Sequence, residues 1–184
     1  MKLIKEELNR INKKIDEFVD SDFSFLKEIL NFSLRNRGKQ LRAIIGILSS
    51  KLISDTMLNE NQIKFLVSVE LIHNATLIHD DIIDEAQTRR NQETLCKKFN
   101  NKLAVLTGDF YLSAALNAIV DLQNFELKKF FANSIKELLE GELSQDLSLF
   151  KIPSVEEYKE RIRQKTALLF ELACFGSCLL LFYS

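Results

Sequence analysis

Three aspartates stand close together at Asp80, Asp81 and Asp84. On a helix that turns about 100° per residue, Asp84 falls about 40° from Asp80, and His73 falls about 20° from it. These three side chains therefore share one face, while Asp81 lies about 100° round, close enough to share a metal ion or to support its neighbours. Crowded carboxylates without a counter-charge raise one another's pKa. The cluster therefore needs a cation.

Magnesium matches this need, because it takes oxygen ligands and usually binds through one or two carboxylates together with the phosphates of a substrate. Arg89 and Arg90 follow the cluster, and guanidinium groups pair with phosphate in a bidentate geometry. Acids, metal and arginines together predict a diphosphate site. The alternative is a solvated helix end at which the aspartates only form exposed ion pairs with the two arginines.

The elements that position these residues are predicted to be helices. With 184 residues, 5 glycines, 1 proline and 46% apolar side chains, the chain has the length and composition of one all-α domain. Residues 54–59 and 88–101 are expected to be a loop and a linker. Apolar spacing predicts helices over about 2–20, 23–34, 39–53, 61–85, 103–120 and 124–150, and a last helix from a capping box at Ser154 and Glu157 to the chain end.

The acidic cluster falls at the C-terminal end of the helix predicted over 61–85. The helix dipole is negative at that end, so aspartates there destabilise the helix unless a cation offsets them. This placement favours a metal site over an incidental acidic surface.

Composition excludes some other classes of function. A net charge of -1 gives no basic face for nucleic acid. Three cysteines favour a reducing compartment, so we expect a cytoplasmic protein without a disulfide framework. Cys174 and Cys178 could supply two metal ligands, but core packing is the favoured interpretation. The apolar tail over residues 167–184 raises the possibility of a membrane anchor; because Glu171 interrupts it, we expect a buried helix and no membrane span.

Three further motifs accompany the acidic helix in a fixed order: residues 38–42 (GKQLR) before it, and Gly141-Glu142 with Gln145 and then residues 165–167 (KTA) after it. In this order and spacing they resemble the trans-isoprenyl diphosphate synthases, the polyprenyl synthetase family. The resemblance runs from about Phe25 to Phe175. It implies an all-α, isoprenoid-synthase-type helical bundle, with residues 1–184 forming a single partial domain that stops before the family's second aspartate-rich motif.

The resemblance also implies roles for individual residues. In the family reaction, an allylic diphosphate ionises and the double bond of isopentenyl diphosphate attacks the resulting carbocation. The implied Mg²⁺ ligands are Asp80 and Asp84, with Asp81 in support. The residues implied to contact isopentenyl diphosphate are Lys39, Arg42, His73 and Arg90, and those implied to contact the allylic diphosphate are Arg89, Lys165 and Thr166. Ala75 and Thr76 would form the floor that sets the product chain length. Taken alone, Lys39 and Arg42 could be solvated charges, and His73 could be a core histidine.

Two departures from the family pattern stand out. The family usually reads Gly-Gly-Lys-Arg where this chain has Arg37-Gly38-Lys39-Gln40, and no aspartate follows Asp146 to form the second aspartate-rich motif. We therefore expect a prenyltransferase that is incomplete as a catalyst and works as a homodimer or heteromer. The alternatives are a non-catalytic diphosphate-binding subunit of a heteromeric synthase and a helical interaction protein. A terpene cyclase explains the basic residues less well.

Overall fold

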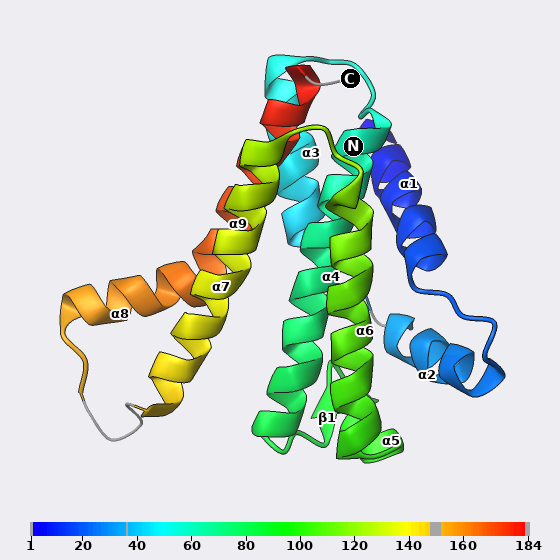
Figure 1. The fold of residues 1–184 in the computed structure, drawn as a ribbon, viewed down its shortest axis with the longest axis vertical. Coiled ribbons are helices and arrows are strands. Elements are labelled where there is room, and N and C mark those ends of the chain that lie inside the picture. Colours follow the sequence, from blue (N-terminus) through cyan, green and yellow to red (C-terminus); the bar gives the residue numbers. More distant parts are fainter. Residues whose placement is uncertain (1, 36, 148–151, 183–184) are drawn as a thin grey trace.

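The computed structural model describes residues 2–35, 37–147 and 152–182, and the described chain is built almost entirely from helices (Figure 1). The helices are α1 (Lys2–Phe18), α2 (Ser24–Leu34), α3 (Leu41–Ile53), α4 (Glu60–Ile83), α5 (Leu95–Lys98), α6 (Asn101–Val120), α7 (Phe125–Leu147), α8 (Val155–Ile162) and α9 (Leu168–Leu179). A π-helix, η1 (Arg163–Ala167), joins α8 to α9, and a 3₁₀ turn, η2 (Leu180–Phe182), follows α9. The all-α prediction is confirmed.

Most predicted helices agree with the structure to within two residues. The predicted capping box is present, since Ser154 Oγ accepts from Glu157 N at 3.1 Å and Glu157 Oε2 accepts from Ser154 N at 2.7 Å. A second capping box, between Asn59 and Gln62, starts α4 and was not predicted. The last helix was predicted as one uninterrupted element, and here the prediction was wrong, because the π-helix interrupts it. Residues 148–150 of the helix predicted over 124–150 lie outside the described chain.

The predicted linker over 88–101 is also more ordered than expected. Strand β1 (Thr88–Arg89) pairs antiparallel with β2 (Gln92–Glu93), and α5 follows this hairpin. The two turn residues, Arg90 and Asn91, have φ of 53° and 62°, the left-handed conformation that tight hairpin turns require. The hairpin lies beside the C-terminal end of α4 and brings Arg89 into contact with Asp81 of the acidic cluster.

Helix α4 runs through the middle of the molecule beside α6, and α3 lies along α9 (Figure 1). Nearly every residue of α4 from Gln62 to Ile72 is buried, so this helix is a rigid support for the side chains at its C-terminal end. The main core draws residues from seven helices, α1, α2, α3, α4, α6, α7 and α9. Its fully buried members include Ile11 and Ile15 of α1, Ile47 of α3, Phe65, Leu66 and Ala75 of α4, Ala115 of α6, and Leu172 and Ala173 of α9.

Two helical stretches of the described chain, Asn101–Val120 and Val155–Phe182, are long and apolar enough to cross a membrane by length and composition alone. Core helices of soluble proteins pass the same test, and residues of both stretches belong to the main core. The absence of a membrane span therefore stays a prediction. Cys174 and Cys178 are half-buried and line an apolar groove with Leu52, Ile53 and Phe175.

Candidate functional site

The acidic face of α4 is built as its spacing predicts. Asp80 is half-buried in the last turn, and Asp84 caps the helix and is exposed. Burial raises the pKa of Asp80 above its ordinary value, and the charges of Glu142 and Asp84 raise it further, while Lys165 and Arg89 oppose them. The protein's own cations therefore leave this carboxylate in a net unfavourable setting, as a site for an added cation requires.

The wall facing Asp80 comes from α7 and the π-helix. Lys165 Nζ donates to Glu142 Oε2 at 3.0 Å. Burial lowers the pKa of Lys165, but the hydrogen bond to Glu142 and the charges of Glu142, Asp80 and Asp84 outweigh it, so the pKa is raised and the side chain stays cationic. Thr166, beside Lys165, is exposed.

The π-helix packs closely against α7. A Cβ atom on Gly141 would lie 2.7 Å from Gln164 Cβ, so glycine allows the two segments to approach. Single π-turns within α-helices are frequent at functional sites. Here the turn carries the Lys165-Thr166 pair. The side chain of Gln145, the third residue of the 141–145 motif, lies outside the described residues.

Asp81 does not share the face of Asp80 and Asp84. It is buried, with 8% of its surface exposed, and its Oδ1 accepts from Arg89 Nε at 2.7 Å. Because Arg89 lies in strand β1, this ion pair ties the hairpin to α4. The support predicted for Asp81 thus takes the form of a contact that positions an arginine, and the contact of Arg89 with an allylic diphosphate stays a prediction.

A cluster of cations surrounds His73, which lies about two turns before Asp80 and about three turns before Asp84 on the same helix face. Burial and the charges of Arg42, Arg90 and Arg89 lower the pKa of His73 to about 3, so the imidazole is neutral near pH 7. Within the described chain, Arg42 Nε is buried and has no hydrogen-bond partner. The Arg42 guanidinium carbon lies 4.8 Å from the centre of the Phe170 ring. A buried donor without an acceptor, among other cations, is what an anion site requires.

Sequence reasoning missed Glu70, which lies at the base of this cluster. It is 1% exposed, and its Oε1 accepts from Ala43 N at 2.8 Å. Burial raises the pKa of Glu70, while that hydrogen bond and the charges of Arg42 and Arg90 oppose the rise. The signal in the sequence was a glutamate within an apolar run, three residues before His73 and therefore on the same helix face.

The remaining predicted residues are placed as follows. Lys39 is exposed beside Gly38. Ala75 is fully buried in the main core, and the half-buried Thr76 donates its hydroxyl to His73 O at 2.8 Å. Their roles in setting product length stay predictions, because core burial fits both a tunnel wall and ordinary helix packing.

Within the described residues, no three His, Cys, Asp or Glu side chains are arranged to hold a metal ion by themselves. The donor set that is present, Asp80 and Asp84, matches a cation that completes its shell with water and with the phosphates of a ligand. The arrangement thus combines a candidate anion site around Arg42 and His73 with a carboxylate pair that favours a hard divalent cation.

Comparison with known proteins agrees with this geometry. Residues 23–182 match the family model described as polyprenyl synthetase. The chain is 33% identical over 178 residues to the all-trans-nonaprenyl-diphosphate synthase (geranyl-diphosphate specific) of Rhodobacter capsulatus, covering 96% of this chain and 54% of that protein. It is 31% identical over 173 residues to heptaprenyl diphosphate synthase component 2 of Bacillus subtilis, covering 93% of this chain and 49% of the relative.

The fold agrees as well. The crystal structure of polyprenyl synthase from Caulobacter crescentus, complexed with calcium and isoprenyl diphosphate, superposes with a TM-score of 0.88 at 27% identity, covering 97% of this chain and 54% of that one. The helical bundle is therefore of the isoprenoid-synthase type. The chain spans about half the length of the curated relatives it matches.

Proposed function

This chain belongs to the polyprenyl synthetase family, and we propose that it binds isopentenyl diphosphate and an allylic prenyl diphosphate for a Mg²⁺-dependent prenyl transfer that lengthens the allylic chain. The observation that carries the proposal is the buried Arg42 Nε, which has no acceptor within the described chain, beside a neutral His73 and two more arginines. Two diphosphate ligands explain why this cationic cluster accompanies the acidic face.

In this proposal each group of residues has one task. Lys39, Arg42, His73 and Arg90 bind the diphosphate of isopentenyl diphosphate, and Arg89, Lys165 and Thr166 bind the allylic diphosphate. Asp80 and Asp84 would hold Mg²⁺, with Asp81 positioning Arg89. When bound, the metal neutralises charge on the departing diphosphate. The apolar faces of α4 and α6 keep water from the reactive carbon, and Ala75 and Thr76 border the growing chain.

Calorimetric titration tests the proposal. Geranyl diphosphate should release or absorb heat on binding with Mg²⁺ and much less in EDTA, and Asp80→Ala should remove the metal-dependent part. The matched control is Asp22→Ala, since Asp22 is an exposed aspartate outside the site. Equal binding of geranyl diphosphate in Mg²⁺ and in EDTA would exclude the metal assignment.

A second candidate is that the chain works as one subunit of a heteromeric synthase in the cytoplasm. Its similarity to a relative named heptaprenyl diphosphate synthase component 2 favours this candidate. The chain alone should then bind diphosphate with little turnover, and turnover should appear when a partner chain is added. Full turnover by a pure, monomeric sample would contradict it.

A further inference from the structure

We infer that Asn12 of α1 is a positioning residue for the loop of residues 37–40, which carries Lys39 and leads into Arg42. This inference deepens the proposed function and rests on it, because the loop belongs to the proposed isopentenyl diphosphate site. No part of the acidic helix or of its arginines makes the contact. It comes instead from the first helix of the chain, about 25 residues earlier in the sequence.

Three hydrogen bonds connect Asn12 to the two ends of the loop. Arg37 Nη1 donates to Asn12 O at 2.9 Å and to Asn12 Oδ1 at 3.0 Å, and Gln40 Nε2 donates to the same Oδ1 at 2.9 Å. Arg37 also forms an ion pair with Asp16, one turn further along α1. Because arginine can only donate, the Asn12 atom that it contacts must be the amide oxygen, and Gln40 must then present its amide nitrogen.

Arg37 and Gln40 are also the two positions at which this chain departs from the Gly-Gly-Lys-Arg pattern of the family. Glycine at position 37 would have no side chain to reach Asn12. The two replacements thus occur together with a shared partner on α1, and Lys39 between them is retained. The departures do not weaken the loop; they anchor it from outside.

The backbone of the loop needs such an anchor. Gly38 has φ of 66° and Gln40 has φ of 48°, and only the glycine adopts the left-handed conformation without steric penalty. Gln40 is 8% exposed and directly precedes the first residue of α3. Its conformation therefore sets the direction in which α3 begins, and with it the position of Arg42 in the first turn. Holding the Gln40 side chain by Asn12 opposes its return to an ordinary conformation.

The loop in turn contacts the arginine of the hairpin. A Cβ atom on Gly38 would lie 2.0 Å from Arg90 Nη1, so the guanidinium packs directly against the glycine backbone. A shift of the loop therefore displaces Arg90 as well as Lys39 and Arg42. Through two side chains, Asn12 determines the position of three cations proposed to bind one diphosphate.

The competing explanation is that Asn12 only attaches α1 to the rest of the bundle. The two explanations differ in one observable, the affinity for isopentenyl diphosphate in protein that is still folded. Asn12→Ala removes the acceptor, whereas Asn12→Asp keeps two oxygens that can accept from Arg37 and Gln40. Asn9→Ala is the matched control, because Asn9 is exposed on the same helix.

The experiment is a calorimetric titration of the full chain with isopentenyl diphosphate, combined with hydrogen–deuterium exchange of the peptide covering residues 37–44. Asn12→Ala should bind about tenfold more weakly, the size expected when one hydrogen bond to a charged ligand group is lost, and exchange in that peptide should be faster. Asn12→Asp and Asn9→Ala should match the wild type in both measurements.

Each other result decides against the inference in a recognisable way. Unchanged affinity in Asn12→Ala, with or without faster exchange, overturns the positioning role while leaving the proposed function intact. No binding by the wild type overturns the proposed function, and the inference falls with it. If Asn12→Ala does not fold, Arg37→Ala removes two of the three hydrogen bonds from the loop side and must give the weaker binding and faster exchange.

Discussion

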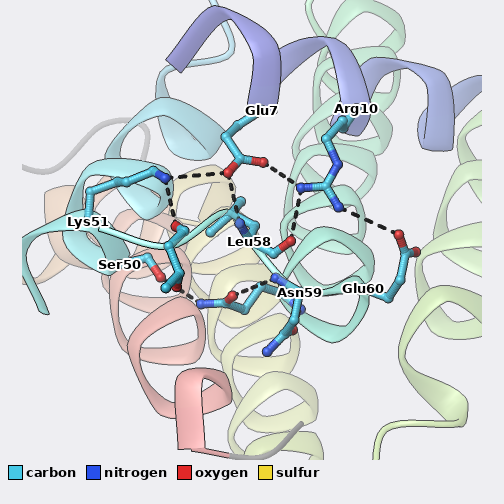
Figure 2. Close-up of polar contacts among 9 residues, drawn as sticks. Glu7, Arg10, Ser50, Lys51, Leu58, Asn59 and Glu60 are labelled. Carbon is cyan, nitrogen blue, oxygen red and sulfur yellow. Dashed lines mark hydrogen bonds and ion pairs between the residues drawn. The ribbon is translucent and has the colours of Figure 1, made fainter. Parts of the chain in front are cut away.

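The two ends of α4 both gather buried charge, and they treat it in opposite ways. At the N-terminal end, Glu7 of α1 is fully buried and is surrounded by partners of opposite charge or by backbone donors (Figure 2). At the C-terminal end, burial and the charges of neighbouring carboxylates raise the pKa of the half-buried Asp80, while the charges of Lys165 and Arg89 oppose the rise. The first arrangement is complete within the protein, whereas under the proposed function the second is completed by a cation and a diphosphate.

The cluster around Glu7 can be followed atom by atom in Figure 2. Glu7 Oε1 accepts from Leu58 N at 2.8 Å and lies 3.6 Å from Lys51 Nζ, and Glu7 Oε2 accepts from Arg10 Nη1 at 2.8 Å. Arg10 also donates to Leu58 O at 2.9 Å. The network joins α1, α3 and the start of α4, so its role is to hold three elements together.

The contrast between the two ends shows how a binding site can be recognised before any ligand is seen. A buried carboxylate with a full set of donors is satisfied within the fold, while a carboxylate with like charges beside it at the negative end of a helix dipole reduces stability. The fold does not need the second arrangement for its stability. Asp80, Asp84 and Glu142 are therefore better explained by cation and diphosphate binding than by folding.

The largest effect is expected from Glu7→Ala. Removing Glu7 leaves the buried Leu58 N without its acceptor and takes the carboxylate away from Arg10 and Lys51, which destabilises by about 3–5 kcal/mol. Urea denaturation measures this loss, with the exposed neighbour Glu6→Ala as control. Diphosphate affinity should be unchanged at temperatures where the variant is folded. A change in diphosphate affinity without a loss of stability would contradict the assignment of the Glu7 network to stability and of the Asp80 end to binding.

Asp80→Asn should give the opposite pattern. Mg²⁺-dependent binding of geranyl diphosphate should weaken at least about a hundredfold, because one of two proposed metal ligands loses its charge. Stability without ligand should rise by about 0.3–1 kcal/mol, since a negative charge leaves the C-terminal end of the helix. A thermal melt and a titration on the same sample test both parts, and a destabilised variant would show that Asp80 has a structural role.

The sequence predicted the acidic end of α4 better than it predicted the rest of the site. The spacing of Asp80, Asp84 and His73 predicted one shared face because a helix has a fixed period. The buried upstream residues of α4 form a regular helix, so the prediction holds along its length. Helix ranges were predicted for the same reason. The buried contact between Asp81 and Arg89 was not predicted, because the hairpin of Arg89 consists of strands two residues long, which have no detectable periodicity.

Contacts between distant segments could not be predicted in this way. The π-helix at Lys165 accompanies the packing of Gln164 against Gly141, and the anchoring of Gln40 depends on Asn12. Neither pair has a local signature, because the residues concerned lie more than 20 positions apart. The family resemblance supplied the motif at Lys165-Thr166 but not the backbone that presents it.

Ala75→Phe tests whether a buried position of α4, between the two ends compared above, only packs in the core or also borders the proposed site. Ala75 is fully buried in the core, so a phenyl ring without space would overpack it and destabilise by about 1–3 kcal/mol. If Ala75 instead borders a tunnel, stability should change less. The variant should then make shorter products when it is assayed with a partner chain that gives turnover. Chromatography of products beside a thermal melt separates the cases, and Ala132→Phe on the exposed face of α7 is the control. Unchanged products from a stable variant would exclude the tunnel.

The smallest effect concerns the protonation of His73. Its pKa in the folded protein is about 3, below the ordinary value of 6.5, so between these values the unfolded chain binds a proton that the folded chain does not. The stability associated with neutral His73 is therefore fully present above pH 6.5 and is lost as the pH falls towards 3. Between pH 6.5 and pH 5.5 the expected loss is at most about 1.4 kcal/mol. Urea denaturation across this range measures it.

His73→Gln should remove this acid sensitivity, whereas His79→Gln, at the only other histidine in the sequence, should leave the contribution of His73 in place.

Ligand binding should also change the pKa of His73. Because Arg42, Arg89 and Arg90 help to lower the pKa of His73, a diphosphate that neutralises them should raise it, and the rise can be followed by the imidazole NMR signals during titration. The buried network around Glu7 offers no such response, since its charges are already paired. A pKa of His73 that stays constant on saturation with isopentenyl diphosphate would place the ligand away from the cationic cluster.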